Sequence, residues 1–102
     1  MVKLIVLYGP PSDPEAFDAH YFGTHLPLAE KIPGVKGFSV SKLGAIDSSA
    51  SPYYLLAELS FDSSESMQAA LATAEGQAAA GDIANFATGG VTMLVADVVA
   101  GE

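Results

Sequence analysis

The strongest structural signal in this chain is the stretch Phe17-Asp18-Ala19-His20-Tyr21-Phe22-Gly23-Thr24-His25-Leu26-Pro27-Leu28. On a helical wheel, Phe17, Tyr21, His25, Leu28 and Ile32 fall within an arc of about 80°, which is typical of a buried stripe. A histidine therefore shares its helix face with large, mostly apolar side chains. Such an imidazole is either a neutral, hydrogen-bonded core group or a group that performs chemistry in a pocket.

The composition limits what this protein can bind. Twelve acidic side chains face four lysines and no arginine, which gives a formal charge of −8. Nucleic acids and anionic membranes require cationic side chains, so we expect neither as a partner. Nucleotides and other phosphate-bearing ligands are disfavoured because no guanidinium is available to bind them. We therefore expect a small, mostly apolar organic ligand.

Further limits come from length and residue usage. The 102 residues, half of them hydrophobic, predict a single folded domain over 1–102. No cysteine is present, which excludes disulfides, thiolate metal sites and a cysteine nucleophile. No apolar run is long enough to span a membrane, and the start of the chain lacks a signal-peptide pattern, so we expect a cytoplasmic protein.

Four strands and two helical regions are predicted. Apolar and β-branched runs predict strands over 2–8, 35–43, 53–61 and 91–99. The first helical region begins at an Asp13 N-cap, with a break or kink expected over 23–26 before Pro27, and continues to residue 31. The second begins at a capping box of Asp62 and Glu65, is weakened by Gly76, and ends near residue 81. Residues 82–86 are expected to add one more turn.

The order β-α-β-β-α-β predicts an α+β, ferredoxin-like sandwich, with four antiparallel strands and both helical regions on one face. The strands are close to continuously apolar instead of alternating with polar residues. A sheet of this kind needs cover on both faces, and the helices suffice for only one. We therefore predict a homodimer in which the sheets of two subunits pack against each other.

Several of these residues resemble the EthD-like family of the dimeric α/β-barrel superfamily. The resemblance is carried by the first-helix pattern around Tyr21 and His25, the Ile32-Pro33-Gly34-Val35 turn, and the Asn85-Phe86 segment before Gly89-Gly90. It implies a ferredoxin-like monomer, a β-barrel dimer, and a small-molecule cavity between the sheet and the helices. The family is named for a protein linked to ether degradation. Its wider superfamily includes cofactor-free monooxygenases, isomerases, cyclases and haem enzymes, so fold alone does not fix the reaction.

Candidate site residues follow from chemistry and position. His25 is the candidate catalytic acid or base. His20 lies off the apolar stripe, where we expect the solvent edge, and its spacing of five from His25 argues against a shared metal site. We expect no metal and no cofactor. The candidate ligand-binding residues are Tyr8, Tyr21, Tyr54, Glu58, Asn85 and Phe86.

Two functions remain open at this stage. The first is cofactor-independent acid/base chemistry, such as isomerisation, cyclisation or oxygenation, with His25 moving the proton and a tyrosine binding the developing oxyanion. The second is a non-catalytic ligand-binding or accessory protein of a degradation or biosynthetic pathway. In a third interpretation, His25 is sealed in a packed core without a cavity, and the protein then has neither of these functions.

Overall fold

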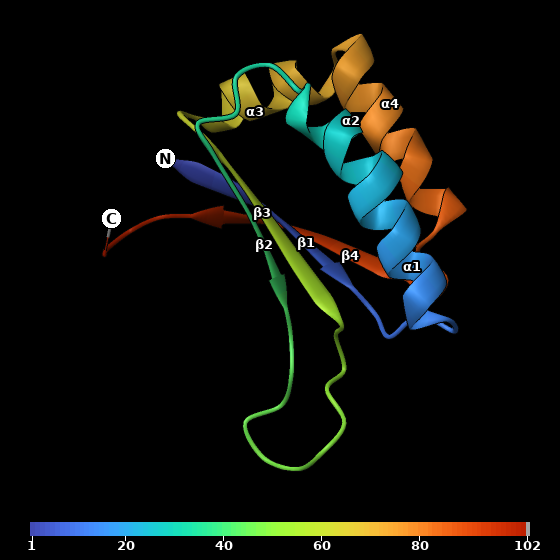
Figure 1. Ribbon diagram of the computed structural model, residues 1–102. Coiled ribbons are helices and arrows are strands. Elements are labelled where there is room, and N and C mark those ends of the chain that lie inside the picture. Colours follow the sequence, from blue (N-terminus) through green and yellow to red (C-terminus); the bar gives the residue numbers. More distant parts are fainter. Residues whose placement is uncertain (102) are drawn as a thin grey trace.

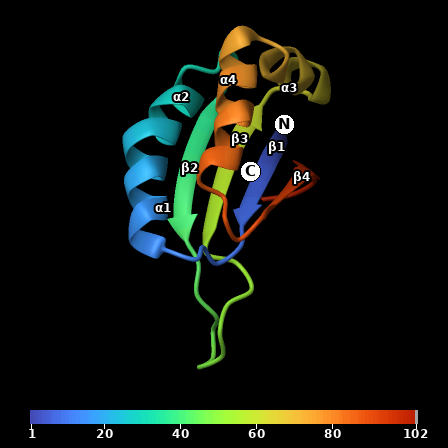
Figure 2. The ribbon, with the colours of Figure 1, turned by 90° about the vertical axis from the view of Figure 1, so that its right-hand side faces the viewer.

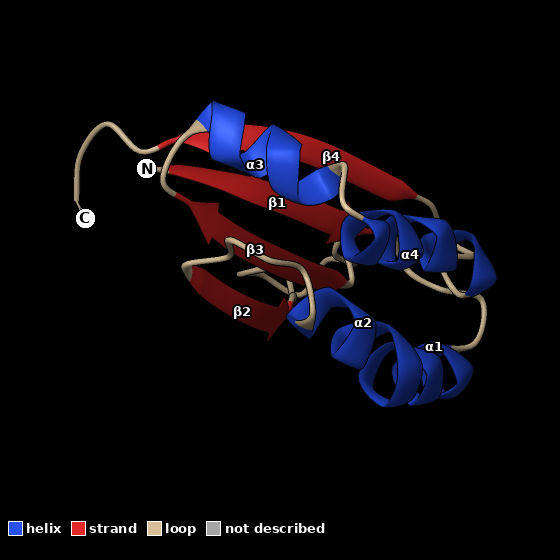
Figure 3. Cartoon of the chain, turned by 90° about the horizontal axis from the view of Figure 1, so that it is seen from above, coloured by secondary structure: helices blue, strands red, loops and turns tan. Residues whose placement is uncertain are grey.

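A computed structural model describes residues 1–101 of the chain. Its sheet contains β1 (Val2–Tyr8), β2 (Gly37–Lys42), β3 (Leu55–Phe61) and β4 (Val91–Asp97) in the order β2-β3-β1-β4, with every pair antiparallel (Figure 1). The helices lie on one side of this sheet (Figure 3). These features confirm the predicted ferredoxin-like fold. Strands β2, β3 and β4 are shorter than predicted by three, two and two residues, because pairing beyond their ends is limited to single bonds such as Lys36 N–H to the Ser60 carbonyl.

The first helical region is one continuous rod. It consists of α1 (Pro14–His20), a π-helical turn η1 (Tyr21–His25) and α2 (Leu26–Glu30). The break expected over 23–26 is instead this π-helical turn, in which the Leu26 N–H bonds the carbonyl of Tyr21, five residues back. Pro27 has no N–H, and its ring crowds the carbonyl four residues before it in a regular α-helix. The wider turn accommodates the proline while the backbone remains helical.

The second helical region is two helices, and the prediction of one was wrong. It consists of α3 (Ser64–Leu71), α4 (Ala74–Asp82) and a 3₁₀ turn η2 (Ile83–Asn85). Thr73 separates them because its side chain caps α4, accepting from the Gly76 N–H at 3.0 Å. The capping box at the start of α3 is formed by Ser63 and Ser66, so the predicted Asp62 and Glu65 box was displaced by one residue.

The core lies between the helices and one face of the sheet. Alternate side chains of β1 and β3 point toward the helices and are buried, and Tyr8, Tyr21, Leu55 and Phe61 are at most 1% exposed. Phe17, Tyr21 and Phe86 surround Tyr8 with ring centroids 5.4–5.7 Å apart. This aromatic cluster joins β1 to the first helical region and to the segment after α4. No helix within residues 1–101 is long and apolar enough to cross a membrane.

Strand β4 is not covered by the helices. Figure 2, seen from the helical side, shows α1 and α2 beside β2, α4 in front of β3, and β4 at the opposite, open edge. Met93 and Val95 face the helical side yet are 48% and 56% exposed. On the opposite face of the sheet, Leu94 is 53% exposed beside Ile5. Both faces of β4 therefore present apolar side chains to the outside of the monomer.

A close backbone crossing ties the end of β1 to the start of β4. The Gly9 N–H donates to the Gly90 carbonyl at 3.0 Å. A Cβ atom on Gly9 would collide with the Gly89 carbonyl, and one on Gly89 would collide with the carbonyls of Gly9 and Pro10. Only glycine permits this approach, which holds the preceding segment, including Phe86, against the end of β1.

We predict that Gly89→Ala lowers the free energy of unfolding by about 1–3 kcal/mol, because the backbone must separate to admit the methyl group. Gly44→Ala is the matched control, since a Cβ there meets nothing within 4 Å. Urea denaturation of both variants measures the difference. Equal stability of the two variants would contradict the proposed close packing at the crossing.

Candidate functional site

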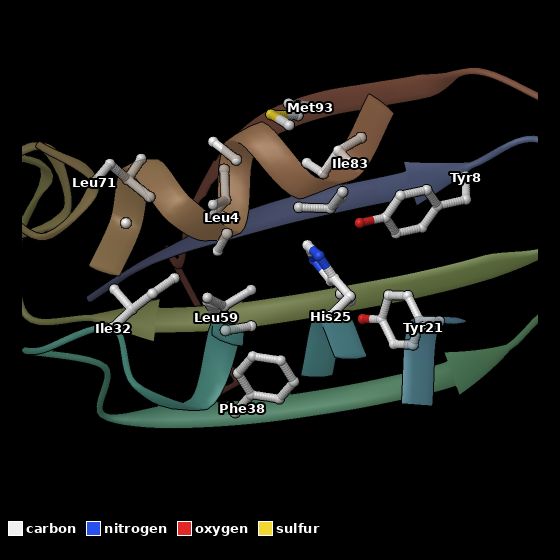
Figure 4. Close-up of a pocket in the computed structure, with 16 residues that line it drawn as sticks. Leu4, Tyr8, Tyr21, His25, Ile32, Phe38, Leu59, Leu71, Ile83 and Met93 are labelled. Atoms are coloured by element: carbon white, nitrogen blue, oxygen red, sulfur yellow. The ribbon is translucent and has the colours of Figure 1, made fainter. Parts of the chain in front are cut away.

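A cavity of about 130 Å³ lies between the sheet and the helices (Figure 4). Its walls are almost entirely apolar, and small residues of α4 form one side. The lining residues are Leu4, Val6, Tyr8, Tyr21, His25, Ala29, Ile32, Phe38, Ala57, Leu59, Leu71, Gly76, Ala79, Ala80, Ile83 and Met93. Since Met93 is half exposed, the cavity borders the open edge at β4. The expectation of a sealed core without a cavity does not fit this structure.

Three polar groups meet at one end of the cavity. Figure 4 shows the His25 imidazole and the hydroxyls of Tyr8 and Tyr21 grouped there, while Ile32 and Leu71 lie at the other end. Neither hydroxyl has a hydrogen-bond partner among residues 1–101, although both tyrosines are 1% exposed. The two hydroxyls are therefore available to a ligand oxygen within the cavity.

The orientation of His25 is fixed by a buried carboxylate. Its Nδ1 lies 3.0 Å from Oδ2 of Asp82, and the two side chains are 7% and 8% exposed. Because an ionised carboxylate only accepts, Nδ1 carries the proton and Nε2 keeps its lone pair in the neutral ring. Nε2 has no partner within the described part of the chain, so the free lone pair belongs to the side of the ring that lines the cavity.

Asp82 also binds His20 and Asn85. Nε2 of His20 lies 2.9 and 3.0 Å from the two carboxylate oxygens, and Asn85 donates its side-chain N–H to Oδ1 at 3.0 Å. On a regular α-helix, side chains five residues apart point in different directions, and the sequence prediction assumed such a helix. In the π-helical turn, residues five apart lie nearly above one another, so both imidazoles reach one carboxylate. No group of three or more His, Cys, Asp or Glu within 1–101 is arranged to hold a metal ion.

A protein-family model described as the EthD domain matches residues 9–90 of the sequence. The chain belongs to the EthD family. Among its relatives is an uncharacterised 11.0 kDa protein of Rhodococcus erythropolis from the thcB–thcC intergenic region, which is 46% identical over 95% of this chain and 94% of its own length.

Solved structures agree with this assignment of the EthD domain. A crystal structure of an EthD family protein from Bacillus halodurans is 41% identical, with a TM-score of 0.92 over 97% of this chain and 99% of that chain. A dimeric ferredoxin-like protein from Thermobifida fusca is only 14% identical, with a TM-score of 0.71 over 95% of this chain and 90% of that chain. The second likeness shows the ferredoxin-like fold alone.

The other predicted ligand-binding residues of the EthD domain lie outside the cavity. Tyr54 precedes β3, and its hydroxyl bonds Asp18 at 2.9 Å and Lys42 at 2.7 Å on the surface. Glu58 is on the opposite face of the sheet, where it accepts a bond of 3.4 Å from Ser39. Positions 54 and 58 would share a face of a regular strand, but Tyr54 lies before β3 and its ring packs on Phe17 at the helical side.

Asn85 and Phe86 support the site without lining the cavity. Asn85 holds the Asp82 carboxylate, as described above. Phe86 packs against the His25 ring, with centroids 4.8 Å apart, and against Tyr8 and Tyr21. These two residues therefore form the layer behind the three polar groups.

The sequence interpretation did not identify Asp82 as the partner of His25. A signal was available in the spacing of α4, whose buried residues Gly76, Ala79 and Asp82 recur every three positions. A carboxylate on the inward stripe of a helix requires a donor from another element. Two histidines in the preceding helical region were the available donors.

Burial and hydrogen bonding set the charge states of the EthD site. Burial lowers the pKa of His25 and outweighs the opposing effect of the Asp82 bond and charge, so the imidazole is a free base at neutral pH. Burial acts to raise the pKa of Asp82, but bonds from Asn85, His20 and His25 exceed it and lower the pKa. Burial also raises the pKa of Tyr8, and it raises that of Tyr21 to about 12, so both hydroxyls remain donors.

We predict that buried His25 makes stability depend on pH. Its pKa is about 6.5 in an unfolded chain and lower in the fold, so between these values the unfolded state binds more protons. The free energy of unfolding should therefore fall as the pH decreases below about 6.5. Urea denaturation gives the free energy of unfolding at about pH 7.5 and at about pH 5. This free energy should decrease more between the two pH values for the wild type than for His25→Gln. Equal losses in the two proteins would contradict a depressed pKa.

Proposed function

We propose that this EthD protein performs cofactor-independent acid/base chemistry on a small, mostly apolar organic compound held in the cavity. The observation that supports this most strongly is the free Nε2 of His25, backed by Asp82 and placed at the same end of the cavity as two unpartnered hydroxyls. A base, a carboxylate that orients it and oxygen-binding donors are the parts required for proton abstraction beside a carbonyl group.

The proposed reaction begins when the carbonyl oxygen of the ligand accepts hydrogen bonds from Tyr8 and Tyr21. Nε2 of His25 then removes a proton from the neighbouring carbon, which generates an enolate and an imidazolium. The hydroxyls stabilise the developing oxyanion, and the charge of Asp82 stabilises the imidazolium. His25 returns the proton to a different atom in an isomerisation or cyclisation, whereas an oxygenation also requires dioxygen as a co-reactant.

The cavity restricts the ligand by size and by charge. An apolar protein cavity of about 150 Å³ is known to hold benzene, so about 130 Å³ accommodates a molecule near the size of a single ring. Its lining contains no lysine and no carboxylate. A carboxylate ligand would lose its hydration without gaining a cationic partner. Small cyclic ketones, enones and phenols therefore fit the cavity better than organic acids.

The alternative is a non-catalytic ligand-binding or accessory protein of a degradation or biosynthetic pathway. A neutral imidazole and two hydroxyls at the end of an apolar cavity also suit the binding of an unreactive ligand. In that case His25 only forms a hydrogen bond with the ligand. The two functions differ in whether a proton leaves the carbon of the bound compound.

We predict that the protein catalyses exchange of the α-hydrogens of cyclohexanone for deuterium in heavy water. Proton NMR follows the loss of the α-hydrogen signal. His25→Gln should reduce the protein-catalysed rate by about 10²–10⁴-fold, because the general base is lost. Tyr21→Phe should also reduce the rate, whereas Tyr54→Phe should not, since the Tyr54 hydroxyl is engaged outside the cavity by Asp18 and Lys42.

Binding is measured separately with 4-fluorophenol, whose fluorine NMR signal shifts when the molecule enters the cavity. Binding combined with exchange supports the enzyme. Binding without exchange of cyclohexanone or of related cyclic ketones favours the accessory protein. Absence of both, in a protein shown to be folded, would exclude the cavity as a ligand site.

We also propose a homodimer formed through the face of the sheet that points away from the helices. The partly exposed side chains Ile5, Leu7, Leu56 and Leu94 supply the apolar surface of this face. The dimeric description of the remote ferredoxin-like structure is consistent with this arrangement. Covering these side chains removes apolar area from water on both subunits.

We predict that Leu94→Glu shifts the protein from dimer to monomer in light scattering after size-exclusion chromatography. The new carboxylate would be buried without a partner in the proposed interface. Gln77→Glu is the control, because it adds the same charge to the exposed outer side of α4. A Leu94→Glu protein that remains a dimer at low concentration would refute packing through this face.

A further inference from the structure

We propose that His20 is a positioning residue that tunes the basicity of His25 through the carboxylate they share. It holds Asp82 from the solvent side and, when doubly protonated, opposes protonation of His25. The inference extends the proposed acid/base function of His25 to a residue that does not line the cavity. The coupling between the two imidazoles exists in the ligand-free protein, so it can be measured without a substrate.

The geometry places His20 between Asp82 and the solvent. Nε2 of His20 contacts both carboxylate oxygens, at 2.9 and 3.0 Å, whereas Nδ1 of His25 contacts only Oδ2, at 3.0 Å. The His20 ring stacks on Phe86 with centroids 5.2 Å apart and an interplanar angle of 24°. Its side chain is 29% exposed, compared with 7% for His25. His20 is therefore held in place on one side and open to water on the other.

The hydrogen-bond directions define the charge states. Asp82 accepts, so Nε2 of His20 donates in both the neutral and the charged ring. The remaining nitrogen, Nδ1, has no partner within residues 1–101 and is the atom that gains or loses a proton. His20 can therefore become cationic without breaking its bond to Asp82.

The titratable groups around the two imidazoles come from α4, β1, η1 and the segment before α1. Asp82 of α4 faces both imidazoles, while Tyr8 of β1 and Tyr21 of η1 are neutral hydroxyls on the cavity side. Asp13, before α1, lines the same surface hollow as His20. A cation at His20 opposes a second cation at His25 across one carboxylate, and this repulsion is among the effects that lower the pKa of His25.

This coupling extends the pH range over which His25 is a free base. When the exposed imidazole of His20 is cationic, its charge partly cancels the field of Asp82 at the buried imidazole of His25. Nε2 of His25 then retains its lone pair at a lower pH than it would beside Asp82 alone. Without His20, the carboxylate would favour the imidazolium, and the base would be lost at a higher pH.

Substitution by glutamine separates this role from a purely structural one. The side-chain nitrogen of Gln lies close to the position of the imidazole Nε2, so His20→Gln can keep the bond to Asp82 but never carries a charge. His20→Phe keeps a ring to stack on Phe86 and loses both the donor and the charge. A residue that only held Asp82 in place would be replaced by Gln with no effect on the titration of His25.

The test is an NMR titration of the imidazole C2–H signals in the intact protein without ligand. The chain contains two histidines, so His20→Gln leaves His25 as the single imidazole signal. We expect the pKa of His25 to rise in His20→Gln and to rise at least as far in His20→Phe. Lys36→Gln is the control, because it removes an exposed cation that pairs with Asp62 elsewhere, and it should leave the pKa of His25 unchanged.

An unchanged pKa of His25 in a folded His20→Gln protein would overturn the proposal. If both variants fail to fold, the wild type decides, because two coupled imidazoles must each report the titration of the other as a second step. A single-step curve for His25 would then refute the coupling. Loss of cyclohexanone exchange bears on the proposed reaction alone, so the two failures are distinguishable.

Discussion

The structure depends on one buried carboxylate. Asp82 lies at the end of α4, where it receives hydrogen bonds from His20, His25 and Asn85. An ionised carboxylate loses several kcal/mol of hydration when buried, and only a full set of donors compensates for that loss. The first helical region and α4 are therefore fixed relative to each other by a polar contact, while the apolar cavity remains open beside it.

Periodicity predicted the element order and the inward position of His25. The apolar, β-branched runs of the strands and the apolar stripe through Phe17, Tyr21 and His25 are local properties, and they do not depend on the rest of the fold. By contrast, periodicity could not predict that the side chains of His20 and His25 reach the same carboxylate. A helical wheel assumes a constant turn, and a π-helical turn ahead of Pro27 changes the relative direction of residues on its two sides.

Other errors arose where partners distant in the sequence decide the outcome. Tyr54 looked like a cavity residue, but Asp18 and Lys42 hold its hydroxyl at the surface. Asp82 was not recognised as a site residue, because its two histidine donors lie 57 and 62 residues earlier in the chain. Sequence patterns show which side chains need partners, but the topology of the fold selects those partners.

The small side chains of α4 have a consequence for how this family can diversify. The three polar groups of the cavity are carried by β1 and η1, whereas Gly76, Ala79 and Ala80 of α4 line the cavity with little side-chain volume. Exchange of either alanine for a larger or polar residue would alter the room for a ligand without replacing any of these polar groups. Under the proposed function, the residues for the chemistry and those for ligand selectivity would lie on separate segments, so a mutation could alter one set without the other.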